Sequence, residues 1–211
     1  MAASAPPGKP RLLLLHGRNS NSEVSRMQAM ILELDRTASC FFLDAPHQAG
    51  KYDRELTEEG RSWVSPDGSV AAAIEHVLAF CRAQGPFDGA YGFSQGCSII
   101  AILSDPGVLR SLGVDAPLWR FVVCACGTHQ LIGKQTDPAV KVPLAIPSLH
   151  IHGEADPILE EARALCDMFD RPHLLTHPWG HAVPLGLSMD QAFVQRVTRF
   201  ITEPDYASPT H

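Results

Sequence analysis

Gly92-Phe93-Ser94-Gln95-Gly96 is the stretch of sequence that decides the fold. A serine with one glycine two residues before it and another two residues after it is typical of a sharp turn between a strand and a helix. Such a turn strains the serine backbone and brings the strand and the helix together, so only small residues fit at the two flanking positions. The serine hydroxyl then projects beyond the end of a sheet.

The segments on either side agree with such a turn. Residues 87–91 read as a short strand launched from Gln84-Gly85-Pro86. Residues 97–103 are apolar nearly all round, and Asp105-Pro106-Gly107 ends them. Periodicity does not separate a buried helix from a buried strand there, but a strand–turn–helix unit requires a helix. The alternative is a plain glycine-bounded turn with a solvated serine.

Short apolar runs alternate with amphipathic helical segments along the rest of the chain. We expect further strands over residues 11–15, 40–43, 121–124, 148–152 and 173–176, and helices over 24–34, 70–81, 158–169 and 188–201. This alternation predicts an α/β fold with a mostly parallel sheet of about six strands and helices on both faces. Chemistry in such sheets lies at the carboxyl ends of the strands.

Two of these helices allow more detailed predictions. In the helix 24–34, one face carries the apolar side chains of Met27, Met30, Ile31 and Leu34. In the helix 188–201, Ser188 is placed to cap the first turn and Gln191 to complete a capping box.

Size and composition predict a single domain over residues 10–203, with a disordered lead over 1–9 and a loose tail over 204–211. The net charge of -6 and the absence of a Lys/Arg cluster argue against a nucleic-acid partner. Neither a membrane-spanning run nor a signal-peptide pattern is present, so we expect no membrane partner and a cytoplasmic location.

The six cysteines form no C-x-x-C pair, which favours buried free thiols in a reducing compartment. Cys124 and Cys126, two residues apart, are expected to share one face of a strand.

A serine hydroxyl becomes a nucleophile only beside a base, and the base needs an acid to hold its tautomer. Asp156, in a loop directly after the strand 148–152, is our candidate acid, with Glu154 as the local rival. A purely structural role for Asp156, capping the following helix, is the other alternative. His181, which follows Gly180 in a loop, is our candidate base, and His177 is its rival.

Other residues complete a candidate pocket. We expect the backbone N–H groups of Arg18, after the first strand, and Gln95 to hold a developing oxyanion. Trp63, Phe93 and Trp179 are candidates for an apolar pocket wall. His150 and His152 alternate along a strand, but no Asp, Glu or Cys pattern in the sequence completes a metal site beside them. We therefore expect neither a metal nor a cofactor.

The chain resembles the FSH family of serine hydrolases. The matching segments span nearly the whole chain in the family's order: Leu14-Leu15-His16-Gly17, Leu43-Asp44-Ala45-Pro46, residues 92–96, residues 147–156 and Gly180-His181-Ala182-Val183-Pro184. The resemblance implies a compact α/β-hydrolase without a separate lid domain, with Ser94, Asp156 and His181 as its triad. Residues 124–129, Cys-Ala-Cys-Gly-Thr-His, depart from the family's usual Ser-Gly-Phe-type loop.

The family includes short-chain carboxylesterases and fungal trans-acting thioesterases that release polyketide chains. The resemblance therefore implies a small acyl ester or thioester as substrate, with the carrier domain of a polyketide synthase as a possible partner. An acyltransferase with the same triad and a non-catalytic binding protein on the hydrolase fold are the alternatives.

Overall fold

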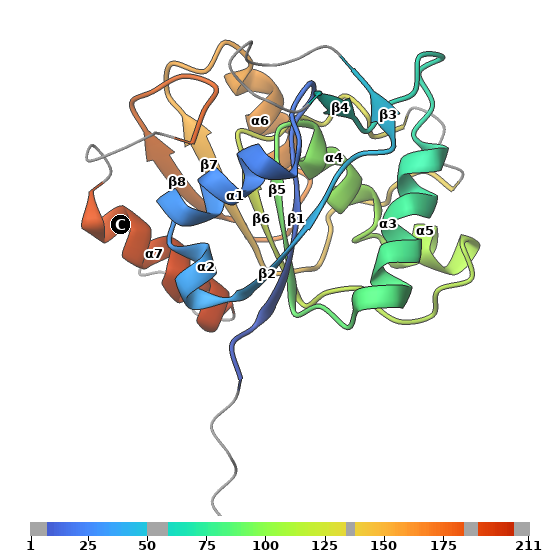
Figure 1. Ribbon diagram of the computed structural model, residues 1–211, viewed down its shortest axis with the longest axis horizontal. Helices are drawn as coiled ribbons and strands as arrows, with labels where there is room; N and C mark the ends of the chain where they lie inside the picture. The colour runs from blue at the N-terminus through green and yellow to red at the C-terminus, as the bar shows by residue number, and fades with distance from the viewer. Residues whose placement is uncertain (1–7, 50–58, 134–137, 184–189, 205–211) are drawn as a thin grey trace, which may run out of the picture.

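A computed structural model describes residues 8–49, 59–133, 138–183 and 190–204. Its main sheet has six strands, all parallel, in the order β2-β1-β5-β6-β7-β8 (Figure 1). This confirms the predicted α/β fold. The strands are β1 (Arg11–Leu15), β2 (Ser39–Leu43), β5 (Gly89–Phe93), β6 (Phe121–Ala125), β7 (Ser148–Gly153) and β8 (His173–His177), and a separate antiparallel pair joins β3 (His47–Gln48) to β4 (Arg61–Ser62).

Helices cover both faces of the sheet (Figure 1). One face carries α1 (Ser22–Ile31), α2 (Leu34–Thr37) and α7 (Gln191–Thr202), and the other carries α3 (Ala71–Gln84), α4 (Gln95–Ile102), α5 (Pro106–Ser111) and α6 (Leu159–Cys166). Because side chains alternate along a strand, Leu12 and Leu14 pack on the α1 side while Leu13 and Leu15 pack on the α4 side. The chain therefore has two cores that share one sheet.

The order of the strands determines where a ligand-binding crevice lies on the sheet. The chain leaves β1 toward β2 on one side and later returns to β5 on the other side. Loops that leave neighbouring strands in opposite directions open a crevice between them, which is where ligands bind in open α/β sheets. Ser94 follows β5, and residues 16–18 follow β1, so both lie at this crevice.

The predicted helix over 24–34 is two helices, because Glu33 takes a positive φ of 53° between them. The face that α1 buries consists of Ser25, Gln28 and Ala29, whereas Met30 is 66% exposed. The predicted apolar face of this segment is therefore not a single core-facing stripe.

Helix α7 begins at Gln191, and the carboxylate of Asp190 accepts the capping hydrogen bond from Ala192 N–H at 3.0 Å. The predicted cap, Ser188, lies outside the described residues. Nearly all of the predicted lead and tail also falls outside them, so the predicted domain limits stay a prediction.

All six cysteines are free thiols, but Cys40 and Cys81 are only half-buried, so the prediction of buried thiols holds for the other four. The prediction that Cys124 and Cys126 share a strand face is wrong. Cys126 follows β6 with a positive φ of 44°, which reverses the alternation, so Cys124 packs in the α4 core and Cys126 in the α1 core.

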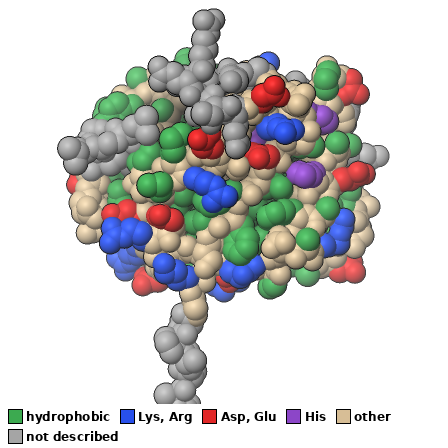
Figure 2. Space-filling model, in the orientation of Figure 1, with side chains coloured by type: hydrophobic (Ala, Val, Ile, Leu, Met, Phe, Trp, Pro, Cys, Tyr) green, Lys and Arg blue, Asp and Glu red, His purple; other side chains and the backbone are tan. Residues whose placement is uncertain are grey.

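Charged side chains of both signs are interspersed with apolar ones on the face that Figure 2 shows. Among the described residues, no helix combines the length and the apolarity needed to cross a bilayer.

Candidate active site

The turn at Ser94 has the strained geometry that its sequence predicts. Ser94 joins β5 to α4 with φ 52° and ψ −115°, a region that L-residues rarely adopt. A Cβ on Gly92 would lie 2.7 Å from the backbone nitrogen of Cys97, and a Cβ on Gly96 would overlap the carbonyl oxygen of Leu15. The absence of a side chain at Gly92 thus lets α4 pack against β5. The absence of one at Gly96 lets α4 pack against the end of β1, a contact that the sequence did not indicate.

Three side chains from distant segments meet beside this turn. His181 Nε2 lies 3.0 Å from Ser94 Oγ, and His181 Nδ1 lies 2.8 Å from Asp156 Oδ2. A carboxylate only accepts hydrogen bonds, so Nδ1–H donates to it and Nε2 is left to accept from the serine hydroxyl. The side chain of Asp156 is fully enclosed, and its other oxygen accepts from Ile158 N–H at 2.8 Å. That bond fixes the carboxylate facing His181.

The rival residues lie differently. Glu154 is exposed. His177 is buried with its ring 5.6 Å from that of Trp179, and within the described chain neither of its ring nitrogens has a hydrogen-bond partner. Asp156 does hold a backbone N–H of the turn before α6, so its structural role and its contact with His181 coexist on different oxygens.

The loop after β1 packs directly against Ser94. A Cβ on Gly17 would lie 2.9 Å from the Phe93 ring and 3.1 Å from Ser94 Cβ. The backbone N–H groups of Arg18 and Gln95 have no hydrogen-bond partner in the part of the chain that the structure describes. Gln95 is also the first residue of α4, where free N–H groups and the helix dipole favour negative charge.

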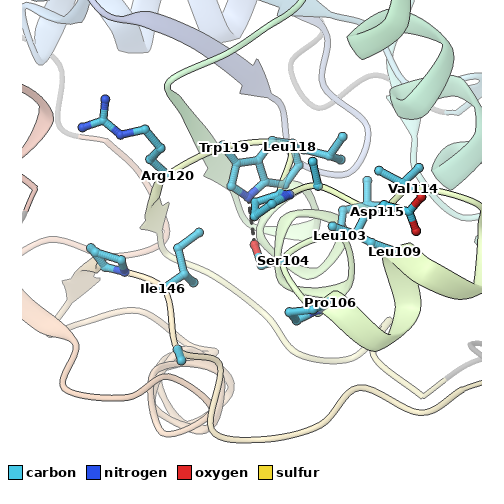
Figure 3. Close-up of a pocket in the computed structure, with 14 residues that line it drawn as sticks. Leu103, Ser104, Pro106, Leu109, Val114, Asp115, Leu118, Trp119, Arg120 and Ile146 are labelled. Atoms are coloured by element: carbon cyan, nitrogen blue, oxygen red, sulfur yellow. Dashed lines mark hydrogen bonds between the residues drawn. The ribbon is translucent and has the colours of Figure 1, made fainter.

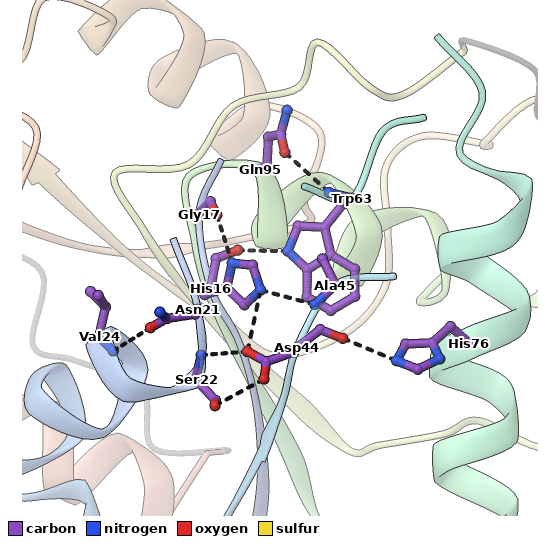
Figure 4. A network of polar contacts seen from close by, with 10 residues as sticks. All are labelled: His16, Gly17, Asn21, Ser22, Val24, Asp44, Ala45, Trp63, His76 and Gln95. Carbon is purple, nitrogen blue, oxygen red and sulfur yellow. Dashed lines mark hydrogen bonds and ion pairs between the residues drawn. The ribbon is translucent and has the colours of Figure 1, made fainter. Parts of the chain in front are cut away.

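A buried network holds this loop in place (Figure 4). His16 Nδ1 donates to the carbonyl of Gly17 at 2.6 Å, and Nε2 accepts from Ala45 N–H at 2.9 Å. Trp63 Nε1 donates to the carbonyl of His16 at 2.7 Å. Gln95 Oε1 accepts from Trp63 N–H at 3.4 Å, which ties the loop to the first residue of α4.

Trp63 was predicted to line the pocket, and this is wrong because the side chain is fully buried beneath the loop. The sequence did not predict that His16 and Trp63 support the loop after β1. The residues lie on different elements, and nothing in either local pattern indicates their contact.

This network makes stability depend on pH. His16 has a lowered pKa, chiefly because the ring is buried; Arg61 lowers it further, while the Gly17 carbonyl and Asp44 oppose the shift. Between the lowered folded value and the ordinary value of 6.5, the unfolded chain binds more protons than the folded chain. The free energy of unfolding should therefore fall as the pH drops below 6.5, by up to about 1.4 kcal/mol per pH unit.

Urea unfolding of wild type and His16→Gln, from about pH 7.5 to about pH 5, measures this contribution. The variant should be less stable at neutral pH and should lose less stability on acidification. Equal losses in the two proteins would show that His16 does not carry the effect.

An apolar cleft of about 480 Å³ opens beside Ser94 and His181. Phe93 lines it, whereas Trp179 is not among the described residues that do. Met27 and Ile31, on the apolar face expected of the first helix, border this cleft. The apolar wall consists of Val24, Met27, Ile31, Phe93, Pro157, Ile158 and Val183.

A second hollow, of about 280 Å³, lies at the amino ends of β6 and β7 (Figure 3). Trp119 Nε1 donates to Ser104 Oγ at 2.9 Å inside it. None of the candidate catalytic residues lines this hollow, so the cleft at Ser94 is the candidate active site.

The sheet, the serine-bearing turn and the cleft at the strand ends define an α/β-hydrolase. A carboxylesterase from Bacillus cereus has a similar structure, with a TM-score of 0.60 and 18% identity over 93% of this chain and 89% of that one. The chain belongs to the Serine hydrolase (FSH1) family, whose sequence pattern matches residues 5–193. It is therefore a hydrolase.

Several relatives carry the name esterase. Esterase OVCA2 from Bos taurus is 35% identical over 61% of this chain and 56% of its own length. Esterase AAEL000016 from Aedes aegypti is 31% identical over 92% of this chain and 77% of its own length. Esterase FPY3 from the fungus Fusarium mangiferae is 28% identical over 82% and 84%.

Proposed function

We propose that this chain hydrolyses carboxylic esters of apolar acyl groups through Ser94, His181 and Asp156. The observation that carries this proposal is the hydrogen-bonded series from Asp156 through His181 to Ser94 at the mouth of an apolar cleft. Family membership supports the reaction class. The hydrogen bonds among the three side chains support their assignment to it.

The geometry suggests each step. His181 Nε2 takes the proton of Ser94 as the serine oxygen attacks the ester carbonyl. The negative charge that develops on the carbonyl oxygen is held by the N–H groups of Arg18 and Gln95. His181 then protonates the departing alcohol, leaving an acyl group on Ser94. Water, activated by the same histidine, cleaves that acyl group and restores the serine.

We favour an oxygen ester because the relatives are named esterases. A thioester would use the same machinery, and a polyketide thioester on a carrier domain would differ in both its acyl chain and its leaving group. Transfer of the acyl group to an alcohol in place of water would also begin with the same acyl-enzyme.

A panel with one acyl chain and three leaving groups separates these possibilities. The same acyl group is presented as an aryl ester, as a coenzyme A thioester and on a carrier protein, and each rate is compared with that of Ser94→Ala. The proposal expects the aryl ester to have the largest kcat/KM. Faster release from the carrier protein would move the assignment to a thioesterase. Ester product formed from an added alcohol would indicate acyl transfer, and equal rates in wild type and Ser94→Ala would refute hydrolysis at this site.

The helix α1 offers a matched test of the acyl site. Met27 lines the cleft, whereas Met30, on the same helix, does not line it and is 66% exposed. Met27→Trp should fill part of the cleft and lower kcat/KM for a long acyl ester about tenfold or more relative to an acetyl ester. Met30→Trp should leave that ratio unchanged. Equal ratios in the two variants would place the acyl chain elsewhere.

A further inference from the structure

A second cluster of chemically active side chains lies on the face of β7 opposite the α1 core. His150 and His152, two residues apart, point to the same side of the strand, while Leu149 and Ile151 pack in the α1 core. The fold brings Cys166, at the end of α6, against them. One ligand atom from each of the three residues lies within 4.8 Å of the other two. The sequence analysis did not identify Cys166 as a third partner, because Cys166 comes from a different element.

All three residues are buried, and each histidine has one ring nitrogen whose hydrogen bonding is unsatisfied. Within the described residues, neither Nε2 of His150 nor Nε2 of His152 has a hydrogen-bond partner. Buried polar atoms without a partner are rare because their desolvation is not compensated. Two such atoms, on the neighbouring rings of a cluster that also holds a thiol, indicate a shared missing ligand.

The arrangement of the two rings suits a metal. Both rings are buried, and their centroids lie 6.2 Å apart at an interplanar angle of 80°. Neutral imidazoles have a lone pair to give to a metal ion. Phe169 packs edge-on against His150 with ring centroids 4.9 Å apart, which restricts the orientation of that ring.

We propose that His150, His152 and Cys166 bind one zinc ion. Two imidazole nitrogens and a sulfur match the preference of Zn²⁺ and exclude Mg²⁺ and Ca²⁺, which take oxygen ligands. Zinc bonds of ~2.0–2.3 Å require ligand atoms ~3.5 Å apart, so no pair would have to close by more than about 1.3 Å. The Cys166 thiol loses its proton to solvent as the zinc–sulfur bond forms.

The site has a structural consequence. Among the described residues, no fourth His, Cys, Asp or Glu ligand atom joins this group, so a water molecule would complete the coordination. A zinc ion here would join α6 to β7 beneath the loop that carries Asp156. Because the folded chain would bind the ion and the unfolded chain would not hold this arrangement, zinc should raise the unfolding temperature.

Cobalt serves as a spectroscopic probe for the test. Reduced, chelator-treated protein is titrated with Co²⁺, and the sulfur-to-cobalt charge-transfer band is followed together with the shift in unfolding temperature on adding Zn²⁺. Wild type should bind one ion with both signals. Cys166→Ser should lose the band and bind at least about tenfold more weakly, since even changes outside the ligand shell cost that much. Cys81→Ser, a half-buried cysteine outside the cluster, should behave as wild type.

His152→Gln provides a second variant if Cys166→Ser does not fold, and it should also lose the zinc-induced shift. The proposal is overturned if wild type shows neither signal or if Cys166→Ser keeps the band. It is also overturned if metal binding abolishes the esterase activity of wild type and Cys126→Ser no longer binds the metal. That result would place the ion at Cys126, Asp156 and His181, the other described group of potential ligands.

Discussion

Replacing Ser94 with alanine is expected to lower kcat/KM for an aryl ester by about 10⁴- to 10⁶-fold. In the proposed reaction Ser94 Oγ is the atom that attacks the ester, so without it the site retains only substrate binding and oxyanion stabilisation. Initial rates with an activated ester measure the loss. An activity within a few-fold of wild type would rule out Ser94 as the nucleophile.

Ser98 is the matched control, since it lies one turn further along α4 and is fully buried. Its hydroxyl donates to the carbonyl of Thr128, so Ser98→Ala should cost about 1 kcal/mol of stability and little activity.

Ser94→Gly separates the loss of activity from the relief of backbone strain. It should be as inactive as Ser94→Ala yet about 1 kcal/mol more stable, because glycine adopts the positive φ freely. Equal stability of the two Ser94 variants would argue against a strained turn.

Replacing Asp156 with asparagine is expected to lower kcat by about 10³- to 10⁴-fold with little change in KM. The amide can donate to His181 Nδ1, which would move the ring proton to Nε2 and leave no acceptor for the Ser94 proton. Steady-state kinetics of the folded variant measure this, and its unfolding temperature shows whether the fold is retained.

Glu154 supplies the control because it was the alternative acid in the same loop. Glu154→Gln removes an exposed carboxylate and should leave kcat within about twofold of wild type. The reverse pattern, with Glu154→Gln inactive and Asp156→Asn active, would mean that the carboxylate facing His181 in solution is Glu154.

The strands and the serine turn were predictable because their signals are local. Leu12 to Leu15 form an uninterrupted apolar run, as expected of a strand buried on both faces, and β1 contains this run. Gly92 and Gly96 mark a close backbone approach that no larger residue permits. Asp156 and His181 could be selected as candidates because each follows a strand, and parallel strands end at one edge of the sheet.

Other features depend on which elements meet, and no local pattern encodes that. The apolar stripe that includes Met27 and Ile31 looks like a core face, but these two side chains border a cleft instead. A single positive φ at Cys126 reverses the expected side of the sheet. Trp63 resembles a pocket residue by type, yet it supports the loop after β1 from below.

Covalent labelling tests the assignment of Ser94 most directly. The folded wild-type chain is treated with a fluorophosphonate, digested and analysed by peptide mass spectrometry. We expect one adduct, on Ser94, and none in unfolded protein or in His181→Ala at the same reagent concentration, because His181 activates the hydroxyl from 3.0 Å. A folded chain that stays unlabelled, or an adduct on another serine, would contradict the assignment.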